Sequence, residues 1–121
     1  MSKTAIILFG HGARDPEWAR PMQRIAEAVQ RMSPQSAVSL AFLEFMTPTL
    51  PEAAAGAVAA GADHLVVVPV FLSQGGHVRR DVPRMLAEIQ AAHPDLKISL
   101  REALGESQQV IDAMASVVLI P

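Results

Sequence analysis

The stretch that decides the fold is AIILFGHGARDP, residues 5–16. It begins with five apolar residues, the length of a short buried strand, and continues into a glycine-rich turn around His11. Asp15 and Pro16 then supply a helix N-cap and a first helical residue, so we expect a helix over residues 16–32. A strand, a tight turn and a helix in direct succession favour an α/β fold.

Three further segments with helical periodicity follow along the chain. The first begins with the capping-box pair Thr49 and Glu52 and runs to Gly61, which is well placed to end it. The second is expected to begin near Asp81, to tolerate Pro83 in its first turn and to end before residue 93. The third is expected from about residue 107. The chain therefore predicts four helices.

Apolar runs at residues 38–43, 65–71 and 98–100 predict three more strands between these helices. Right-handed crossovers between parallel strands then favour a three-layer α/β sandwich with a four-stranded parallel sheet in the order 2-1-3-4. In such open sheets ligands bind beyond the carboxyl ends of the strands, where the strand order reverses. We therefore expect the functional site just after strands one, two and three.

The composition indicates one domain, residues 1–121, with 50% hydrophobic and 18% charged residues. The chain has no cysteine, so a bound metal would need His, Asp or Glu ligands, and a reducing cytoplasm is the expected location. No apolar run approaches the roughly 20 residues of a membrane helix, and the N-terminus does not have the pattern of a signal peptide. A net charge of −2 argues against a nucleic-acid binder that relies on a positive field.

Three potential metal ligands follow the first three predicted strands. His11 follows the first, Glu44 the second and His77 the third. Neighbouring strands lie about 4.8 Å apart, so these side chains can converge on one ion. Two imidazoles and one carboxylate suit a borderline divalent metal such as Co, Ni, Fe or Zn. Another histidine, His64, lies at the opposite end of strand three and is expected to be structural or solvated.

The chain has no Lys or Arg between Met32 and Val78, and then three arginines follow closely: Arg79, Arg80 and Arg84. Their spacing fits a solvated helix face at least as well as an anion site. Their position directly after His77 favours the anion site, and both interpretations stay open at this point.

Three stretches of the sequence resemble the short, single-module sirohydrochlorin cobaltochelatases, the small class II tetrapyrrole chelatases. They are FGHGARDP at 9–16, FLEF at 42–45 with PTLPE at 48–52, and VPVFLSQGGHVRRDVP at 68–83. The resemblance covers nearly the whole chain, and the third stretch is long and specific. It implies a chelatase-like half module that forms a homodimer and inserts Co²⁺, or alternatively Ni²⁺ or Fe²⁺, into sirohydrochlorin without ATP or an organic cofactor. The product would enter cobalamin or siroheme-type biosynthesis.

The resemblance also implies roles for particular residues. His11 and His77 match the family's metal ligands, with His11 also the proton acceptor, and Glu44 matches an accompanying acidic residue. Thr47 falls near a substrate contact, and the tetrapyrrole-contacting loop matches the residues Leu72, Ser73, Gln74, Gly75, Gly76 and His77. Ala13 stands where the family often has Ser. The carboxylates on the rim of sirohydrochlorin would pair with Arg14, Arg79 and Arg80.

Metal insertion needs an ion held near the macrocycle and a base for two pyrrole protons, and neutral imidazole suits both tasks. We expect His77 and Glu44 to keep the ion while His11 releases it and accepts a proton. The low aromatic content favours a ligand held by glycine backbone and aliphatic walls rather than stacked rings. Phosphoryl transfer through a phosphohistidine is one alternative, although Gly10 stands where an arginine would clamp the phosphate. A non-catalytic metal or tetrapyrrole carrier is another.

Overall fold

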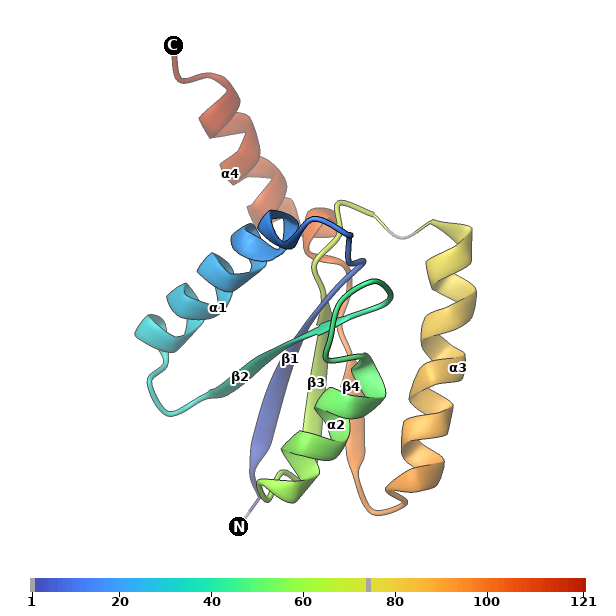
Figure 1. Cartoon of the computed structure of the whole chain (residues 1–121). Coiled ribbons are helices and arrows are strands. Elements are labelled where there is room, and N and C mark those ends of the chain that lie inside the picture. Colours follow the sequence, from blue (N-terminus) through green and yellow to red (C-terminus); the bar gives the residue numbers. More distant parts are fainter. Residues whose placement is uncertain (1, 74) are drawn as a thin grey trace.

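A computed structural model describes residues 2–73 and 75–121 of the chain, and of His77 only its place in a helix. Within these residues, four parallel strands form one sheet: β1 (Thr4–Gly10), β2 (Ala37–Phe42), β3 (His64–Pro69) and β4 (Lys97–Leu100). Their order is β2-β1-β3-β4 (Figure 1). The predicted α/β class and strand order are thus confirmed, with strand boundaries that differ from the expected ones by one or two residues.

Helices cover both faces of the sheet and create two separate apolar cores. On one face, α2 (Leu50–Ala59) and α3 (Gly76–Ala92) pack against the strands, with Ile7, Phe9, Leu65 and Val67 completely buried. On the other face, Met22 of α1 (Arg20–Met32) packs with Leu8, Phe42 and Val68. The alternation of residues between the two cores follows from the period of two along a strand.

The first helix begins later than the sequence predicted. Asp15 does act as an N-cap, accepting a hydrogen bond from the Glu17 N–H at 3.0 Å, but it caps a short 3₁₀ helix, η1 (Pro16–Ala19). The α-helix proper begins at Arg20. Pro21 lacks an N–H and so cannot donate the α-helical hydrogen bond to a carbonyl four residues earlier, in η1. The missing bond explains why η1 and α1 are separate helices. Pro21 therefore lies in the first turn of α1.

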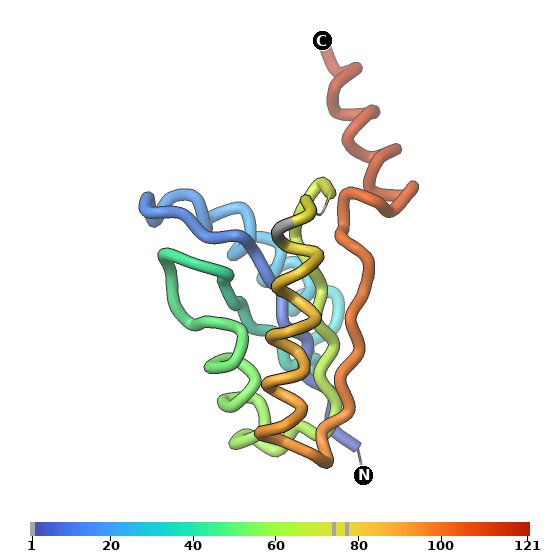
Figure 2. Tube along the Cα trace, turned by 90° about the vertical axis from the view of Figure 1, so that its right-hand side faces the viewer, coloured from blue at the N-terminus to red at the C-terminus, as the bar shows by residue number. Residues whose placement is uncertain are grey.

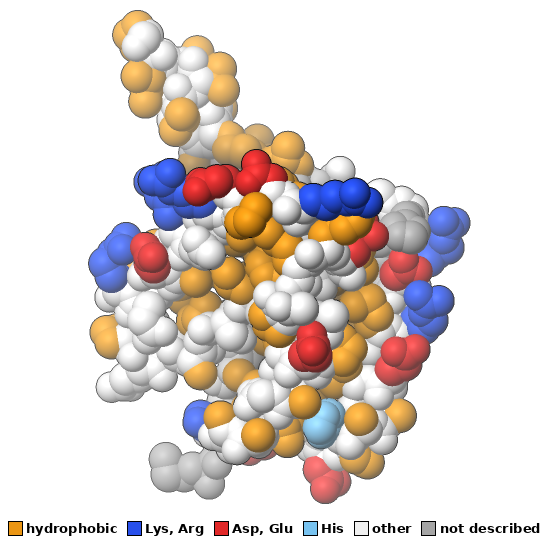
Figure 3. Space-filling view, viewed as in Figure 1, with side chains coloured by type: hydrophobic (Ala, Val, Ile, Leu, Met, Phe, Trp, Pro, Cys, Tyr) orange, Lys and Arg blue, Asp and Glu red, His pale blue; other side chains and the backbone are white. Residues whose placement is uncertain are grey.

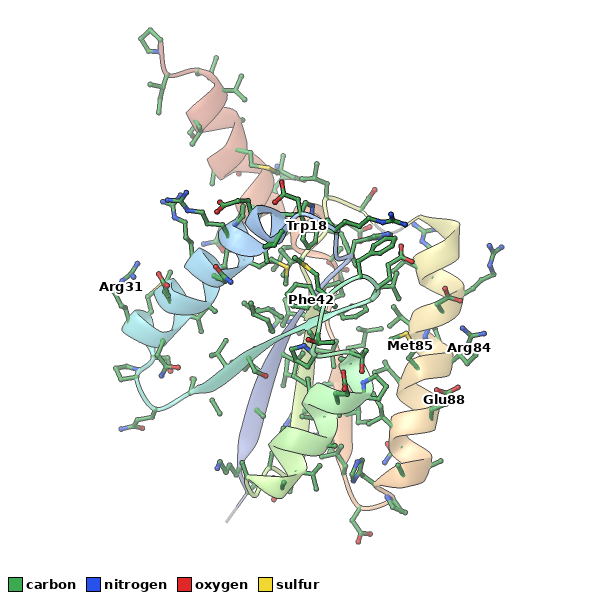
Figure 4. The ribbon with its side chains drawn as sticks, viewed as in Figure 1. Trp18, Arg31, Phe42, Arg84, Met85 and Glu88 are labelled. Carbon is green, nitrogen blue, oxygen red and sulfur yellow. The ribbon has the colours of Figure 1, made fainter. Side chains whose placement is uncertain are left out.

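The third helix begins earlier than predicted, at Gly76 instead of near Asp81. Gly75 is its N-cap, and the Arg79 N–H donates to the Gly75 carbonyl at 3.0 Å. Pro83 consequently lies inside the helix and not in its first turn, where the prediction placed it. Figure 4 shows Arg84 and Glu88 directed outward from this helix and Met85 directed toward the sheet. The earlier start places His77 and the following arginines on a helix and not in a loop.

The predicted capping box at the start of α2 is present. The Glu52 carboxylate accepts a hydrogen bond from the Thr49 N–H at 2.8 Å, and the Thr49 hydroxyl accepts one from the Glu52 N–H at 3.3 Å. The bonds from the Thr49 backbone and hydroxyl lower the pKa of the Glu52 carboxyl below its usual value. A lowered pKa in the folded state means that this contribution to stability is present at neutral pH and is lost as acid protonates the carboxylate.

The last helix, α4 (Gln108–Val118), leaves the body of the protein (Figures 1 and 2). It begins directly after the short 3₁₀ helix η2 (Leu104–Glu106) and the N-cap residue Ser107. Its apolar side chains are largely exposed, Val117 at 66% and Val118 at 80%, and orange apolar atoms cover this arm in Figure 3. None of the helices within the described residues is long and apolar enough to cross a membrane.

Candidate metal and substrate site

Two of the predicted ligands meet at the carboxyl edge of the sheet. His11 directly follows β1 and Glu44 lies just beyond the neighbouring β2. The His11 Nε2 atom is 3.0 Å from the Glu44 Oε1 atom, so the ring N–H donates to the carboxylate. The two side chains are 44% and 46% exposed. The expected proximity of these two groups is confirmed, and both are accessible to a solute.

The backbone joins the two loops that carry this pair. The Leu43 N–H donates to the Gly10 carbonyl at 2.9 Å, and the Glu44 N–H donates to the His11 carbonyl at 3.1 Å. Gly12 has a φ of +96°, and a Cβ atom at this position would overlap the carbonyl oxygen of Glu44. Only glycine adopts this positive φ without strain and also leaves room for the Glu44 carbonyl oxygen. Gly12 therefore allows the close approach that places Glu44 beside His11.

Phe71 supports the imidazole from the third strand's side. Its ring lies edge-on to the His11 ring at 6.4 Å between centroids, and it makes a similar contact with Phe9 at 6.1 Å. The sequence identified Phe71 only as the end of an apolar run. Its contact with His11 depends on the register of β3 against β1, in which Phe9 pairs with Pro69, and periodicity does not reveal a register.

The separation of the His11 and Glu44 atoms suits shared coordination of a metal ion. Two neighbouring ligands with bonds of about 2.1 Å lie roughly 3.0 to 3.4 Å apart in octahedral or tetrahedral geometry. The observed 3.0 Å falls within this range. Among the described side chains, no group of three His, Asp or Glu residues is arranged to hold a metal. The side chain of His77 lies outside that set, so its predicted role as the remaining ligand stays a prediction.

The predicted tetrapyrrole loop, residues 72–77, comprises the connection after β3 and the first two residues of α3. Leu72 is 72% exposed, and Ser73, Gly75 and Gly76 are exposed as well, whereas Gln74 lies outside the described residues. Gly105 in η2 supports the start of this loop: its N–H donates to the Phe71 carbonyl at 2.8 Å, and a Cβ atom on it would overlap the Leu72 backbone. No feature of the sequence identified Gly105, because the contact joins distant segments.

The remaining predicted substrate contacts lie at different places around this edge. The Arg14 guanidinium carbon is 5.2 Å from the centre of the Phe45 ring. Thr47 is exposed and lines a groove with Phe42 between α1 and the end of β2. The predicted contacts on the first turns of α3, Arg79 and Arg80, are exposed.

His64 is separate from this site, as expected. It begins β3 at the opposite edge of the sheet, and its Nε2 atom lies 2.8 Å from the Ser99 hydroxyl. Its Nδ1 atom lies 3.5 Å from the Thr4 hydroxyl. These contacts agree with the expectation that His64 is structural or solvated.

Comparison with known proteins identifies similar sequences. The CbiX family model matches residues 5–119. A protein of Methanocaldococcus jannaschii named sirohydrochlorin cobaltochelatase is 31% identical over 89% of this chain and 92% of its own length. The protein of that name from Saccharolobus solfataricus is 35% identical over 87% of this chain and 85% of its own. That from Methanopyrus kandleri is 44% identical over 68% of this chain, but the match spans only 57% of the relative.

Solved structures show the same fold. A cobalamin (vitamin B12) biosynthesis CbiX protein from Marinobacter aquaeolei VT8 has a TM-score of 0.84 and 32% identity, over 95% of this chain and 93% of that chain. The sirohydrochlorin chelatase SirB of Bacillus subtilis subspecies spizizenii, in complex with cobalt, has a TM-score of 0.82 and 27% identity. This match covers 96% of the present chain but 50% of SirB. SirB from Bacillus subtilis with Fe³⁺ also has a TM-score of 0.82, with 25% identity over 98% of this chain and 48% of its own.

Proposed function

This chain belongs to the CbiX family, and we propose that it is a sirohydrochlorin chelatase that inserts a divalent metal ion into the macrocycle without ATP. The observation that carries the proposal is the His11–Glu44 pair, with 3.0 Å between the two side-chain atoms. The pair is accessible and lies at the ends of β1 and β2, next to the point between β1 and β3 where the strand order of the sheet reverses. Its donor set is the one that borderline divalent metals prefer.

The pair suits both parts of the insertion reaction. A metal ion arriving at Glu44 and His11 would displace the Nε2 proton of His11, which water relays to Nδ1 so that the ring stays neutral, because the same ring nitrogen cannot hold a proton and coordinate an ion. When the pyrrole nitrogens become the ligands, the His11 Nε2 atom is free again and accepts one of the two pyrrole protons, while the other passes to water at this exposed site. Glu44 keeps the resulting imidazolium in place through the hydrogen bond already present in the structure. His77 is proposed as the second imidazole that holds the ion during this exchange.

The substrate is proposed to lie over the same edge of the sheet. The exposed residues Leu72, Ser73, Gly75 and Gly76 lie after β3, and in this proposal they contact the macrocycle together with Gln74. Arg79 and Arg80 at the start of α3 and Arg14 after β1 offer cations to the carboxylates of its rim. Thr47 is proposed as a further contact on the side of β2.

An anaerobic absorbance assay with sirohydrochlorin tests this function. Co²⁺, Ni²⁺ and Fe²⁺ are added in turn, with and without the protein, and the rate of metal insertion is followed from the change in the macrocycle spectrum. We expect catalysed insertion, fastest with Co²⁺ as in the names of the relatives. Binding of sirohydrochlorin without acceleration by any of these metals would instead identify a carrier.

The active form is proposed to be a homodimer. One copy of the chain matches only 48% and 50% of the SirB chains, so the length of one such chain would accommodate two copies. The α4 arm also presents an apolar stripe to solvent, with Val110, Met114, Val117 and Val118 lining one side of it. An unpartnered apolar helix face favours association. We expect the two copies to bury a total of about 1,200 Å² or more.

A charge on the stripe tests this assembly. Met114→Lys places an ammonium on the apolar side of α4, and we expect it to weaken the dimer by on the order of 100-fold, because a buried charge without a partner costs several kcal/mol. Ser116→Lys is the matched control, because it adds the same charge on the opposite side of the helix. Sedimentation equilibrium or light scattering measures both. A wild-type protein that is monomeric at micromolar concentration and fully active would contradict the proposal.

The proposed compartment is the cytoplasm. The absence of cysteine fits a protein that has no need of an oxidising environment. In this compartment, divalent cobalt, nickel or iron ions would be the metal substrate that reaches the site.

A further inference from the structure

Phe45 combines an exposed aromatic ring with an unfavourable backbone conformation. Its φ of +67° is the only positive value at a non-glycine residue among the described parts of the chain. For a bulky side chain this left-handed conformation costs about 1–3 kcal/mol. The residue is also 58% exposed, so the free energy gained by burying its ring offsets little of this cost. Fold stability alone does not account for phenylalanine at this position.

The surroundings hold the Phe45 loop in place. The preceding residue, Glu44, is bonded through its N–H to the His11 carbonyl at 3.1 Å and packs its own carbonyl against Gly12. The Arg14 guanidinium lies over the Phe45 ring, with its carbon 5.2 Å from the ring centre, which is a cation–π contact. Phe45 and Arg14 therefore form a small clamp of one aromatic ring and one cation, built from the loops after β2 and β1.

This clamp lies next to the proposed metal site. The Cα atoms of Glu44 and Phe45 are adjacent in the chain, about 3.8 Å apart, and the Glu44 carboxylate contacts His11 at 3.0 Å. A tetrapyrrole whose central nitrogens reach this pair extends over the neighbouring residues on every side. Such a molecule is flat and apolar in its ring system and carries carboxylates at its rim. An aromatic ring with an adjacent guanidinium matches both features.

We propose that Phe45 is a substrate-positioning residue that packs its ring against the tetrapyrrole while Arg14, held over the same ring, pairs with a rim carboxylate. The inference rests on the proposed function, since it takes sirohydrochlorin as the substrate. It departs from the expectation of aliphatic walls without ring contacts. It also gives the strained φ of Phe45 a role, because the strain keeps the ring exposed beside Glu44.

Two substitutions separate the ring from the backbone. Asparagine adopts a positive φ more easily than phenylalanine, so Phe45→Asn should unfold at the same or a higher temperature than the wild type. Its KM for sirohydrochlorin should nevertheless rise roughly 10-fold, the effect of losing an aromatic contact of 0.5–1.5 kcal/mol together with its buried area. Its kcat and its affinity for Co²⁺ alone should change less than twofold. Phe45→Tyr should keep the wild-type KM.

The control is Met32→Asn, which removes an apolar side chain that is 86% exposed at the end of α1, outside the site. Phe45→Gly replaces the asparagine variant if that one does not fold. Any of three outcomes would overturn the inference. The KM of Phe45→Asn could be unchanged, the KM of Phe45→Tyr could rise as much as that of Phe45→Asn, or the rise in KM could accompany dissociation of a dimer. Binding of metal-free sirohydrochlorin, followed by fluorescence quenching, is measured in parallel. It tests Phe45 even if the wild type shows no insertion, an outcome that would contradict the proposed function alone.

Discussion

His11→Ala is expected to abolish metal insertion, and the loss should persist when the metal is saturating. The His11 Nε2 atom makes the 3.0 Å contact with Glu44, and in the proposed reaction it accepts a pyrrole proton. General acid or base groups contribute about 100- to 10,000-fold to a rate, so a loss within this range is expected for kcat. Glu44→Gln should instead bind Co²⁺ more weakly but recover measurable turnover at high metal concentration. The measurement is the insertion rate of both variants as Co²⁺ is raised to saturation.

His64→Ala is the control for this pair of variants. It removes an imidazole at the opposite edge of the sheet, where His64 contacts Ser99, and insertion should continue at the wild-type rate if the variant is folded. Full recovery of His11→Ala by added metal would contradict the proposed role of His11. It would mean that His11 only recruits the ion and that the proton acceptor is His77, Glu44 or water.

Gly12→Ala is expected to be the most damaging substitution of one glycine by alanine at the site. An alanine at this position must adopt a φ of +96°, and its Cβ atom overlaps the Glu44 carbonyl oxygen. The loops after β1 and β2 must therefore separate. Left-handed backbone alone costs about 1–2 kcal/mol for an L-residue. Displacement of Glu44 from His11 adds a loss of insertion activity, which we expect to exceed roughly 10-fold. Thermal unfolding and the insertion rate measure the two effects separately.

Gly61→Ala is the matched control for the free-energy cost of a left-handed backbone at an alanine. Gly61 has a similar φ of +101°, but the nearest atoms to an added Cβ belong to the Lys3 side chain, at 3.9 and 4.0 Å. It lies after α2, away from the site, so its substitution should lower stability and leave insertion per folded molecule unchanged. Equal activity in the two variants would show that the contact between Gly12 and Glu44 does not position the pair.

Local features of the sequence predicted most of the secondary structure. The apolar run at 5–9 and the Thr49–Glu52 capping box depend on neighbouring residues only, and both appear as expected. The two helix starts that were clearly wrong, those of α1 and α3, had each been predicted from a proline. Pro16 and Pro83 fit the first turn of a helix from their φ preference, yet Pro16 starts a 3₁₀ turn and Pro83 lies within α3. Whether a proline begins, interrupts or is tolerated in a helix depends on the tertiary contacts around it.

The sequence by itself determined the parallel sheet, its strand order and the edge at which His11 and Glu44 meet. Hydrophobic periodicity sets the order of the elements along the chain, and the handedness of crossovers leaves few ways to connect them. Only the tertiary structure decided which residues support that pair: Gly12 beneath Glu44, Phe71 beside His11, and Phe45 under Arg14. These contacts join segments far apart in the chain, and their geometry depends on backbone dihedrals and packing that no local pattern of residues encodes.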